Sequence, residues 1–260
     1  MMMIAGSILL IVTNLLILGL LWLIWCMVRR RGPMTAAKLR QTVCWDKTEP
    51  HELVPCGGDL DVMAALLRAL EQGGDARDLL RGYMVQWERT GAILVGQGTK
   101  KKLRSFGDDV QEELAFPEEL PQLSGAQALL YQRIYSWLPE DGVIQRSELY
   151  QAARQEAEAL GHVMRQLMQE GQRRLREMGG SMLENKKAKM GFSEQSREIY
   201  TRKGVRLASE LAAYTKFMRK HLRTGDAAAA VVGGIVPDCT ICVLADAIYN
   251  GIQAGKQVCR

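Results

Sequence analysis

The stretch Met1–Val28, MMMIAGSILLIVTNLLILGLLWLIWCMV, contains no charged side chain, and a run of three arginines follows it directly. A helix from Ile4 to Val28, rising 1.5 Å per residue, would be roughly 37 Å long, which exceeds the ~30 Å hydrocarbon core of a bilayer. A helix also satisfies its own backbone hydrogen bonds in lipid. The sequence therefore predicts that residues 1–31 form a transmembrane anchor with a basic flank.

The arginines Arg29, Arg30 and Arg31 set the expected orientation, because positive flanks stay on the cytoplasmic side of a membrane helix. Trp22 and Trp25 precede them, as interfacial tryptophans do. We therefore expect a single-pass protein of the cell membrane, with its N-terminus outside, its remaining chain cytoplasmic, and contacts with the bilayer and its anionic headgroups. The alternative, a cleaved signal peptide, would have a basic start and an apolar core of only about 7–15 residues.

The composition is that of a chain that can fold. Hydrophobic residues make up 47% and charged residues 24% of the sequence, and the net charge is +5. These proportions are ordinary for globular proteins, and the roughly 230 residues beyond the anchor suffice for two small domains or one large domain. A positive charge this small is not by itself a sign of nucleic-acid binding.

Residues 58–107 predict a small winged-helix-like module. Asp59 and Asp75 each precede apolar residues at helical spacing, so a helix is expected to begin after each of them. Residues 92–95 and 100–106 are β-prone runs on either side of a glycine-rich turn. Helix, helix and hairpin is the element order of a winged-helix domain.

Residues 123–225 predict a second winged-helix-like module with longer helices. After a first helix, Val143–Ile144 indicates a short strand, and Ser147 begins an apolar stripe that predicts one long helix to about Met178. Residues 181–191 are polar and basic, which indicates an exposed loop or a second wing. Another helix follows.

Residues 226–260 form an apolar C-terminal segment. Pro237, Asp238 and Asp246 interrupt it, so we expect one or two buried helices rather than a second membrane span. The predicted fold class is mainly α with small β-hairpins (α+β). Its expected parts are an anchor at 1–31, a linker at 32–57, a module at 58–107, a connecting loop at 108–122, a second module at 123–225 and the helical segment at 226–260.

Cys239 and Cys242 have the C-x-x-C spacing of zinc and redox sites. Zinc requires four ligands, and the other cysteines and His51 are scattered singly. Apolar neighbours such as Ile241 and Leu244 favour the interpretation of this pair as small buried hydrophobic residues, with metal binding or redox activity as the alternative. In the expected reducing compartment, disulfides are not expected.

Motifs for catalysis are missing from the sequence. It has no P-loop, H-E-x-x-H, G-x-S-x-G or dinucleotide-binding glycine pattern, and its three histidines have no metal-ligand spacing. Paired carboxylates lie in the proline-containing stretch 108–122, where a low-dielectric pocket is not expected. The sequence therefore predicts no enzyme and no cofactor.

A basic cluster of Lys100, Lys101, Lys102 and Arg104 falls on the predicted wing. Wings can contact DNA phosphates, although solvated surface with membrane attraction is the favoured interpretation. The sequence thus predicts a non-enzymatic interaction or scaffold protein at the cytoplasmic membrane face, with a membrane or cytosolic protein partner. The alternative is a membrane-tethered nucleic-acid-binding regulator that uses this cluster.

Three stretches resemble the C-terminal part of the YciQ-like predicted membrane proteins, a family without established function. They are Gly74–Met84, Leu123–Leu149 and Thr201–Leu222, the last with the motif Thr201-Arg202-Lys203-Gly204. The resemblance covers roughly residues 50–225. It implies a shortened member with winged-helix-like modules at the inner membrane surface, and it implies no catalytic residue.

Overall fold

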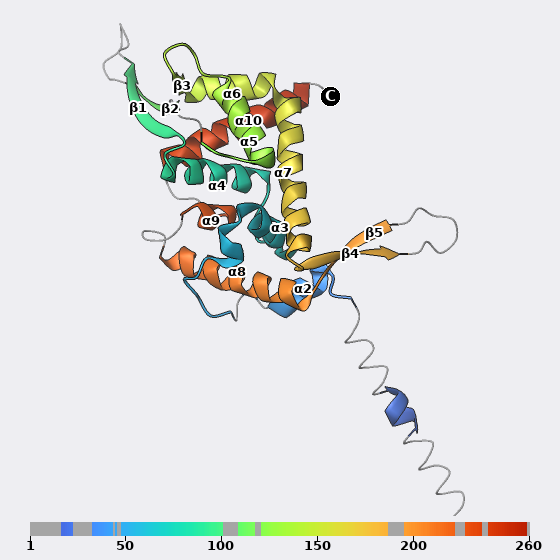
Figure 1. Ribbon diagram of the computed structural model, residues 1–260. Coiled ribbons are helices and arrows are strands. Elements are labelled where there is room, and N and C mark those ends of the chain that lie inside the picture. Colours follow the sequence, from blue (N-terminus) through green and yellow to red (C-terminus); the bar gives the residue numbers. More distant parts are fainter. Residues whose placement is uncertain are drawn as a thin grey trace, which may run out of the picture.

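Helices from along the whole chain, with two small antiparallel sheets, make up the computed structural model (Figure 1). It describes residues 17–22, 33–43, 45, 48–100, 109–117, 121–186, 195–221, 227–235 and 239–258. The predicted class, mainly α with small β elements, is confirmed. The elements are α2 (Ala36–Val43), a 3-10 turn (Pro55–Gly58), α3 (Leu60–Leu70), α4 (Ala76–Arg89), β1 (Leu94–Lys100), β2 (Asp109–Ala115), α5 (Gly125–Tyr135), β3 (Val143–Gln145), α6 (Arg146–Gln155), α7 (Ala157–Glu177), β4 (Ser181–Lys186), β5 (Gln195–Tyr200), α8 (Arg202–Lys220), α9 (Ala227–Val232) and α10 (Thr240–Val258).

Aspartate caps fix the starts of the central helices α3 and α4. The Asp59 carboxylate accepts hydrogen bonds from the backbone N–H groups of Asp61 and Val62, at 3.0 and 3.2 Å. The Asp75 carboxylate accepts one from Asp78 at 2.9 Å. These N–H groups have no partner within the helix itself. Both predicted caps are therefore confirmed.

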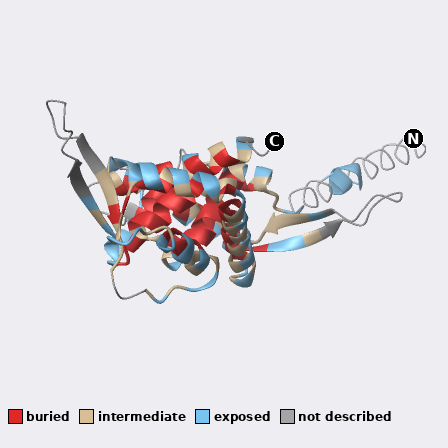
Figure 2. Cartoon of the chain, turned by 90° about the horizontal axis from the view of Figure 1, so that it is seen from above, coloured by how far each residue is buried: buried red, intermediate tan, exposed pale blue. Residues whose placement is uncertain are grey.

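One hydrophobic core joins helices from both ends of the chain. Leu39 of α2, Tyr214 of α8 and Ile248 of α10 are all buried in it. Figure 2 shows the buried residues gathered within the helical body. Since burying a large apolar side chain contributes about 1.5–3 kcal/mol, this shared core holds α2 and α10 in the same body.

Gly251 and Gly255 bring α10 against the backbone at the end of α6. A Cβ atom added at Gly251 would lie 2.4 Å from the carbonyl oxygen of Tyr150, and one added at Gly255 would lie 2.4 Å from that of Arg154. No side chain fits at such distances, so this approach requires glycine at both positions. The prediction of buried helices in the C-terminal segment is confirmed by α9 and α10.

The three-stranded sheet crosses the boundary that the sequence placed between the two modules. β1 pairs with β2, with Leu94 opposite Ala115, and β2 pairs with β3, with Leu114 opposite Ile144. β3 lies in the predicted second module, whereas β1 lies in the first. This connectivity does not support the winged-helix assignment, because the order of elements does not specify which strands pair.

The glycine-rich segment Gly96–Gly98 lies inside β1, so its prediction as a turn was wrong. β1 continues to Lys100, and β2 occupies much of the predicted connecting loop 108–122. β1 is an edge strand of its sheet, and edge positions tolerate residues that interrupt a central strand. Gly96 and Gly98 therefore indicated a turn, although they belong to an edge strand.

Two further expectations were wrong. The linker 32–57 contains the helix α2, whose residues Leu39 and Val43 are buried. The single long helix expected from Ser147 is two helices, α6 and α7, separated at Glu156, whose φ of −102° and ψ of 24° are not helical. Neither glycine nor proline marks this break in the sequence.

The predicted transmembrane anchor falls largely outside the described residues. Of residues 1–31, the structure describes 17–22, which are helical, exposed and apart from the helical body in Figure 1. Within the part of the chain that the structure describes, no helix is long and apolar enough to cross a membrane. The anchor stays a prediction from the sequence.

Candidate functional site

The chain enters the helical body beside β5. The backbone N–H of Tyr200 donates a 2.7 Å hydrogen bond to the carbonyl oxygen of Met34, which forms an isolated antiparallel bridge. Among the predicted anchor residues, Trp22 is described and is 63% exposed, while Trp25 and Arg29, Arg30 and Arg31 lie outside the described residues. The predicted anchor is therefore only a few residues from the base of the β4–β5 pair.

The β4–β5 pair (Ser181–Lys186 and Gln195–Tyr200), here named the ribbon, is fixed firmly at its base. The Thr201 hydroxyl donates to the carbonyl oxygen of Gly179 at 2.6 Å and accepts from the N–H of Gly204 at 3.2 Å. A Cβ atom added at Gly204 would lie 2.0 Å from the Gly180 carbonyl oxygen. The Thr-x-x-Gly motif thus caps α8 and admits the backbone of the α7–β4 turn.

Ion pairs and hydrogen bonds extend this fixation into the strands. Glu198 of β5 accepts hydrogen bonds from Arg176 at 3.0 Å and from the Ser181 hydroxyl at 2.5 Å. Farther along the ribbon, Arg197 donates to Glu184 at 2.9 Å. The ribbon is consequently held in one direction relative to α7 and α8.

The ribbon exposes two large apolar side chains from adjacent positions of one strand. Met182 and Leu183 are 51% and 52% exposed, and Met182 lies opposite Ile199 in the register. Successive residues of a strand point to opposite faces, so neither face of this two-stranded ribbon is covered there. The ribbon therefore carries apolar surface, about half exposed, on both of its faces.

The β1–β2 pair and the ribbon project from opposite ends of the helical body (Figures 1 and 2). Lys100 ends β1 opposite Asp109, while Lys101, Lys102 and Arg104 lie outside the described residues. β2 carries Glu112 and Glu113 in the same pair, opposite Gln97 and Gly96. The described part of this strand pair therefore carries carboxylates.

Cys239 and Cys242 lie at the start of α10. The N–H of Cys242 donates to the carbonyl oxygen of Cys239 at 3.1 Å, so Cys239 holds the capping position and Cys242 the first helical turn. Cys242 is only 2% exposed, whereas Cys239 is half-buried, and both are thiols. A hydrogen bond to Cys239 and burial raise the pKa of the Cys242 thiol.

Charged residues of α4 lie beside this pair. Arg81 donates two hydrogen bonds to Asp246, at 2.7 and 2.6 Å, and Arg77 donates two more, at 2.9 and 2.8 Å. Partial burial acts to raise the pKa of Asp246, but the hydrogen bonds from both arginines outweigh it and the pKa is lowered. Among the described residues, no three histidine, cysteine, aspartate or glutamate side chains are grouped to hold a metal ion.

A second polar cluster, not identified from the sequence, joins α3, α4 and α7. The Tyr83 hydroxyl donates to Asp61, which is only 3% exposed, and Arg174 lies 3.6 Å from Asp61 and 3.1 Å from Asp59. The signal available was an aspartate inside the apolar run that follows Asp59. Because these groups bond one another across three helices, they serve the packing of the body.

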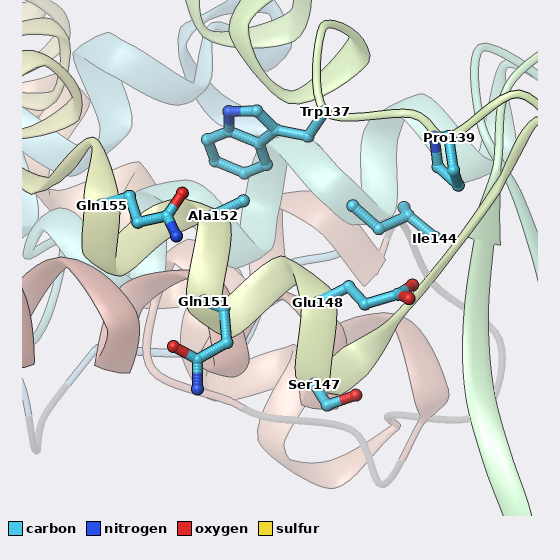
Figure 3. Close-up of a pocket in the computed structure, with 8 residues that line it drawn as sticks. All are labelled: Trp137, Pro139, Ile144, Ser147, Glu148, Gln151, Ala152 and Gln155. Atoms are coloured by element: carbon cyan, nitrogen blue, oxygen red, sulfur yellow. The ribbon is translucent and has the colours of Figure 1, made fainter.

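A hollow of about 410 Å³ lies between Trp137 and α6 (Figure 3). Glu148 on its wall accepts a 2.9 Å hydrogen bond from the N–H of Gln145, which caps α6. Figure 3 shows the Gln151 and Gln155 amides on the same helix. The lining also includes the Ser147 hydroxyl beside Glu148, but the Glu148 carboxylate is engaged in capping α6 rather than bonded to that hydroxyl.

Comparison with protein-family models, with curated proteins and with solved structures finds no match to this chain. The resemblance to the YciQ-like membrane proteins therefore stays a prediction carried by its three motifs.

Proposed function

We propose that this chain is a membrane-anchored, non-enzymatic interaction protein whose helical body rests on the cytoplasmic face of the membrane through the ribbon. The observation that carries this proposal is the Met34–Tyr200 bridge. It ties the segment following the predicted anchor to the base of a ribbon that exposes Met182 and Leu183.

The composition of the ribbon fits an anionic lipid surface. Full burial of an apolar side chain such as Met182 or Leu183 contributes about 1.5–3 kcal/mol. The sequence adds lysines at 186, 187 and 189, and each basic residue near an anionic surface contributes about 1 kcal/mol. The ribbon would thus supply a second contact that fixes the orientation given by the anchor.

This orientation would turn the β1–β2 end of the body away from the membrane. A protein partner would then be met at that end, where Leu94 is exposed and β1 is an edge strand among the described strands. Nucleic-acid binding through Lys100 and its neighbours is the alternative function. The carboxylates of Glu112 and Glu113 in the same strand pair favour a protein partner over a polyanion.

The membrane contact is tested with the full chain in vesicles that contain a photoreactive lipid. Flotation reports anchoring, and mass spectrometry of crosslinked peptides reports which segments touch lipid. We expect crosslinks on residues 181–200 that increase with anionic lipid and fall when Met182 and Leu183 are both changed to Ser. Leu129→Ser, at an exposed position on α5, is the matched control and should leave them unchanged.

The outcomes separate the two parts of the proposal. A chain that does not float with the vesicles would overturn the anchor. A chain that floats but shows no more crosslinking on the ribbon than on α5 would overturn the second contact alone.

The interaction role is tested by pulldown of the full chain from gently solubilised membranes, with and without nuclease. One stoichiometric protein partner that is indifferent to nuclease would support the proposal. Nucleic acid that co-purifies, and is lost when Lys100, Lys101 and Lys102 are changed to Glu, would replace it with the nucleic-acid regulator.

A further inference from the structure

We propose that Cys239 and Cys242 form a thiol-based redox site, which passes between a dithiol and an intramolecular disulfide by exchange with small-molecule disulfides. The site is independent of the membrane contact and goes beyond the proposed interaction role. It rests on the positions of the two thiols, on their unequal burial and on the charges of α4 beside them.

The two thiols occupy different positions at the start of α10. Cys239, half-buried at the capping position, is accessible to a small reagent and sits where the helix presents its positive end. Helix N-termini and neighbouring arginines stabilise thiolates. Cys242 is buried one turn later and keeps its proton, which it shares with Cys239 in a hydrogen bond. The geometry assigns the attack on the small-molecule disulfide to Cys239. It assigns the second step (resolution), in which the mixed disulfide is displaced, to Cys242.

The charge of Arg81 acts on the Cys242 thiol. Its guanidinium is buried and bonded to Asp246, one turn beyond Cys242 on α10, and it lies 3.6 Å from Asp78. Its charge acts to lower the pKa of the Cys242 thiol, and that of Asp246 acts to raise it. Because Arg81 is fixed by two carboxylates, its charge stays in place while Cys242 loses its proton during resolution.

The exchange balances without a further reactant. The Cys239 thiolate attacks a disulfide RS–SR, such as glutathione disulfide, forms a mixed disulfide and releases RS⁻. The released RS⁻ takes up the proton that Cys239 gave to solvent on ionising. The sulfur of Cys242 then attacks the Cys239 sulfur, the Cys242 proton is passed to the departing sulfur, and a second thiol leaves. The pair loses two electrons and two protons in total, and the small disulfide becomes two thiols.

In a reducing compartment the pair rests as the dithiol, as it is in this structure, and oxidation follows a rise in small disulfides. A zinc site is the alternative for this pair. Zinc sites take four protein ligands or three with a water, and in the described chain no third candidate ligand is grouped with these two sulfurs.

The full chain, solubilised in mild detergent, is equilibrated in glutathione buffers of stepped ratio, alkylated and mapped by mass spectrometry. We expect the peptide containing Cys239 and Cys242 to lose two hydrogens cooperatively as the disulfide fraction rises. Cys242→Ser should instead trap one glutathionyl group on Cys239, and Cys239→Ser should leave Cys242 unmodified. Cys56 is the internal control, because it is buried and burial raises its pKa to about 12.

Alkylation rates of the reduced native chain give a second measurement that does not depend on any variant folding. Cys239 should react about tenfold or more faster than Cys56. Equal rates, or no disulfide at any glutathione ratio, would overturn the proposal. Stoichiometric zinc that purifies with the chain and blocks alkylation of both thiols would overturn it in favour of a metal site.

Discussion

The Tyr83 hydroxyl donates a 2.5 Å hydrogen bond to the Asp61 carboxylate, which lies buried between α3, α4 and α7. Burial raises the pKa of Asp61 from 3.8 to about 6, and the hydrogen bond from Tyr83 acts in the opposite direction. Because this carboxyl group lies at the junction of three helices, the free energy of unfolding of the helical body should depend on whether Asp61 is protonated, and therefore on pH.

Asp61→Asn should flatten the pH dependence of stability between about pH 4 and pH 6. Because the folded pKa exceeds the unfolded one, the carboxyl stabilises the fold fully below pH 3.8, and this contribution is lost as the pH rises through about 6. At 1.36 kcal/mol per pKa unit, the difference between the two ends is roughly 3 kcal/mol. Urea unfolding of the full chain in detergent, repeated at several pH values, measures it.

Glu140→Gln, at an exposed turn position, is the matched carboxyl-to-amide control and should follow the original chain at every pH. If the curves of Asp61→Asn and the original chain stay parallel from pH 4 to 7, Asp61 does not titrate as described.

Gly204→Ala should destabilise the chain by about 1–3 kcal/mol, because its Cβ would meet the rigid Gly180 carbonyl 2.0 Å away. Gly161→Ala is the control: its Cβ would meet only the end of the flexible Lys256 side chain, so the helix preference for alanine should leave stability unchanged or slightly raised. Hydrogen exchange in β4 and β5 should accelerate in Gly204→Ala alone. Equal stability and equal hydrogen exchange in the two variants would show that the backbone at the base of the ribbon can shift to accommodate a Cβ atom at position 204.

Local signals in the sequence predicted what local chemistry determines. The caps at Asp59 and Asp75 and the helices that begin after them depend on neighbours within one or two turns. The pairing of β2 with β3 brings together residues on either side of α5, and α2 is a helix of eight residues whose buried face rests on α3 and α8. The spacing of residues does not encode such non-local contacts. The order of elements therefore predicted two separate winged-helix modules, although one sheet contains strands from both.

For the candidate sites, too, the sequence showed the local motifs but not the contacts between distant segments. The C-x-x-C spacing was visible, but the association of the pair with Arg81 and Asp246 depends on α10 packing against α4, more than 150 residues away in the chain. The Thr201-x-x-Gly204 motif was visible too. Its role was not, because the Gly180 carbonyl that requires Gly204 comes from the preceding turn.

Asp246→Ala should cost about 3–5 kcal/mol, because it leaves the buried guanidinium of Arg81 without its bidentate partner. Arg173→Ala, which removes the exposed pairs with Glu170 and Glu177, is the control and should barely move the unfolding midpoint. Combining Asp246→Ala with Arg81→Met should recover part of the loss, since the guanidinium that lost its bidentate partner is then absent. Asp78, the other carboxylate beside Arg81, keeps the hydrogen bond from the N–H of Gly74. The urea midpoints of the original chain, of the single variants Asp246→Ala, Arg81→Met and Arg173→Ala, and of the double variant give this comparison. A double variant whose loss equals or exceeds the sum of its single variants would show that Arg81 and Asp246 do not stabilise the α4–α10 contact as a pair.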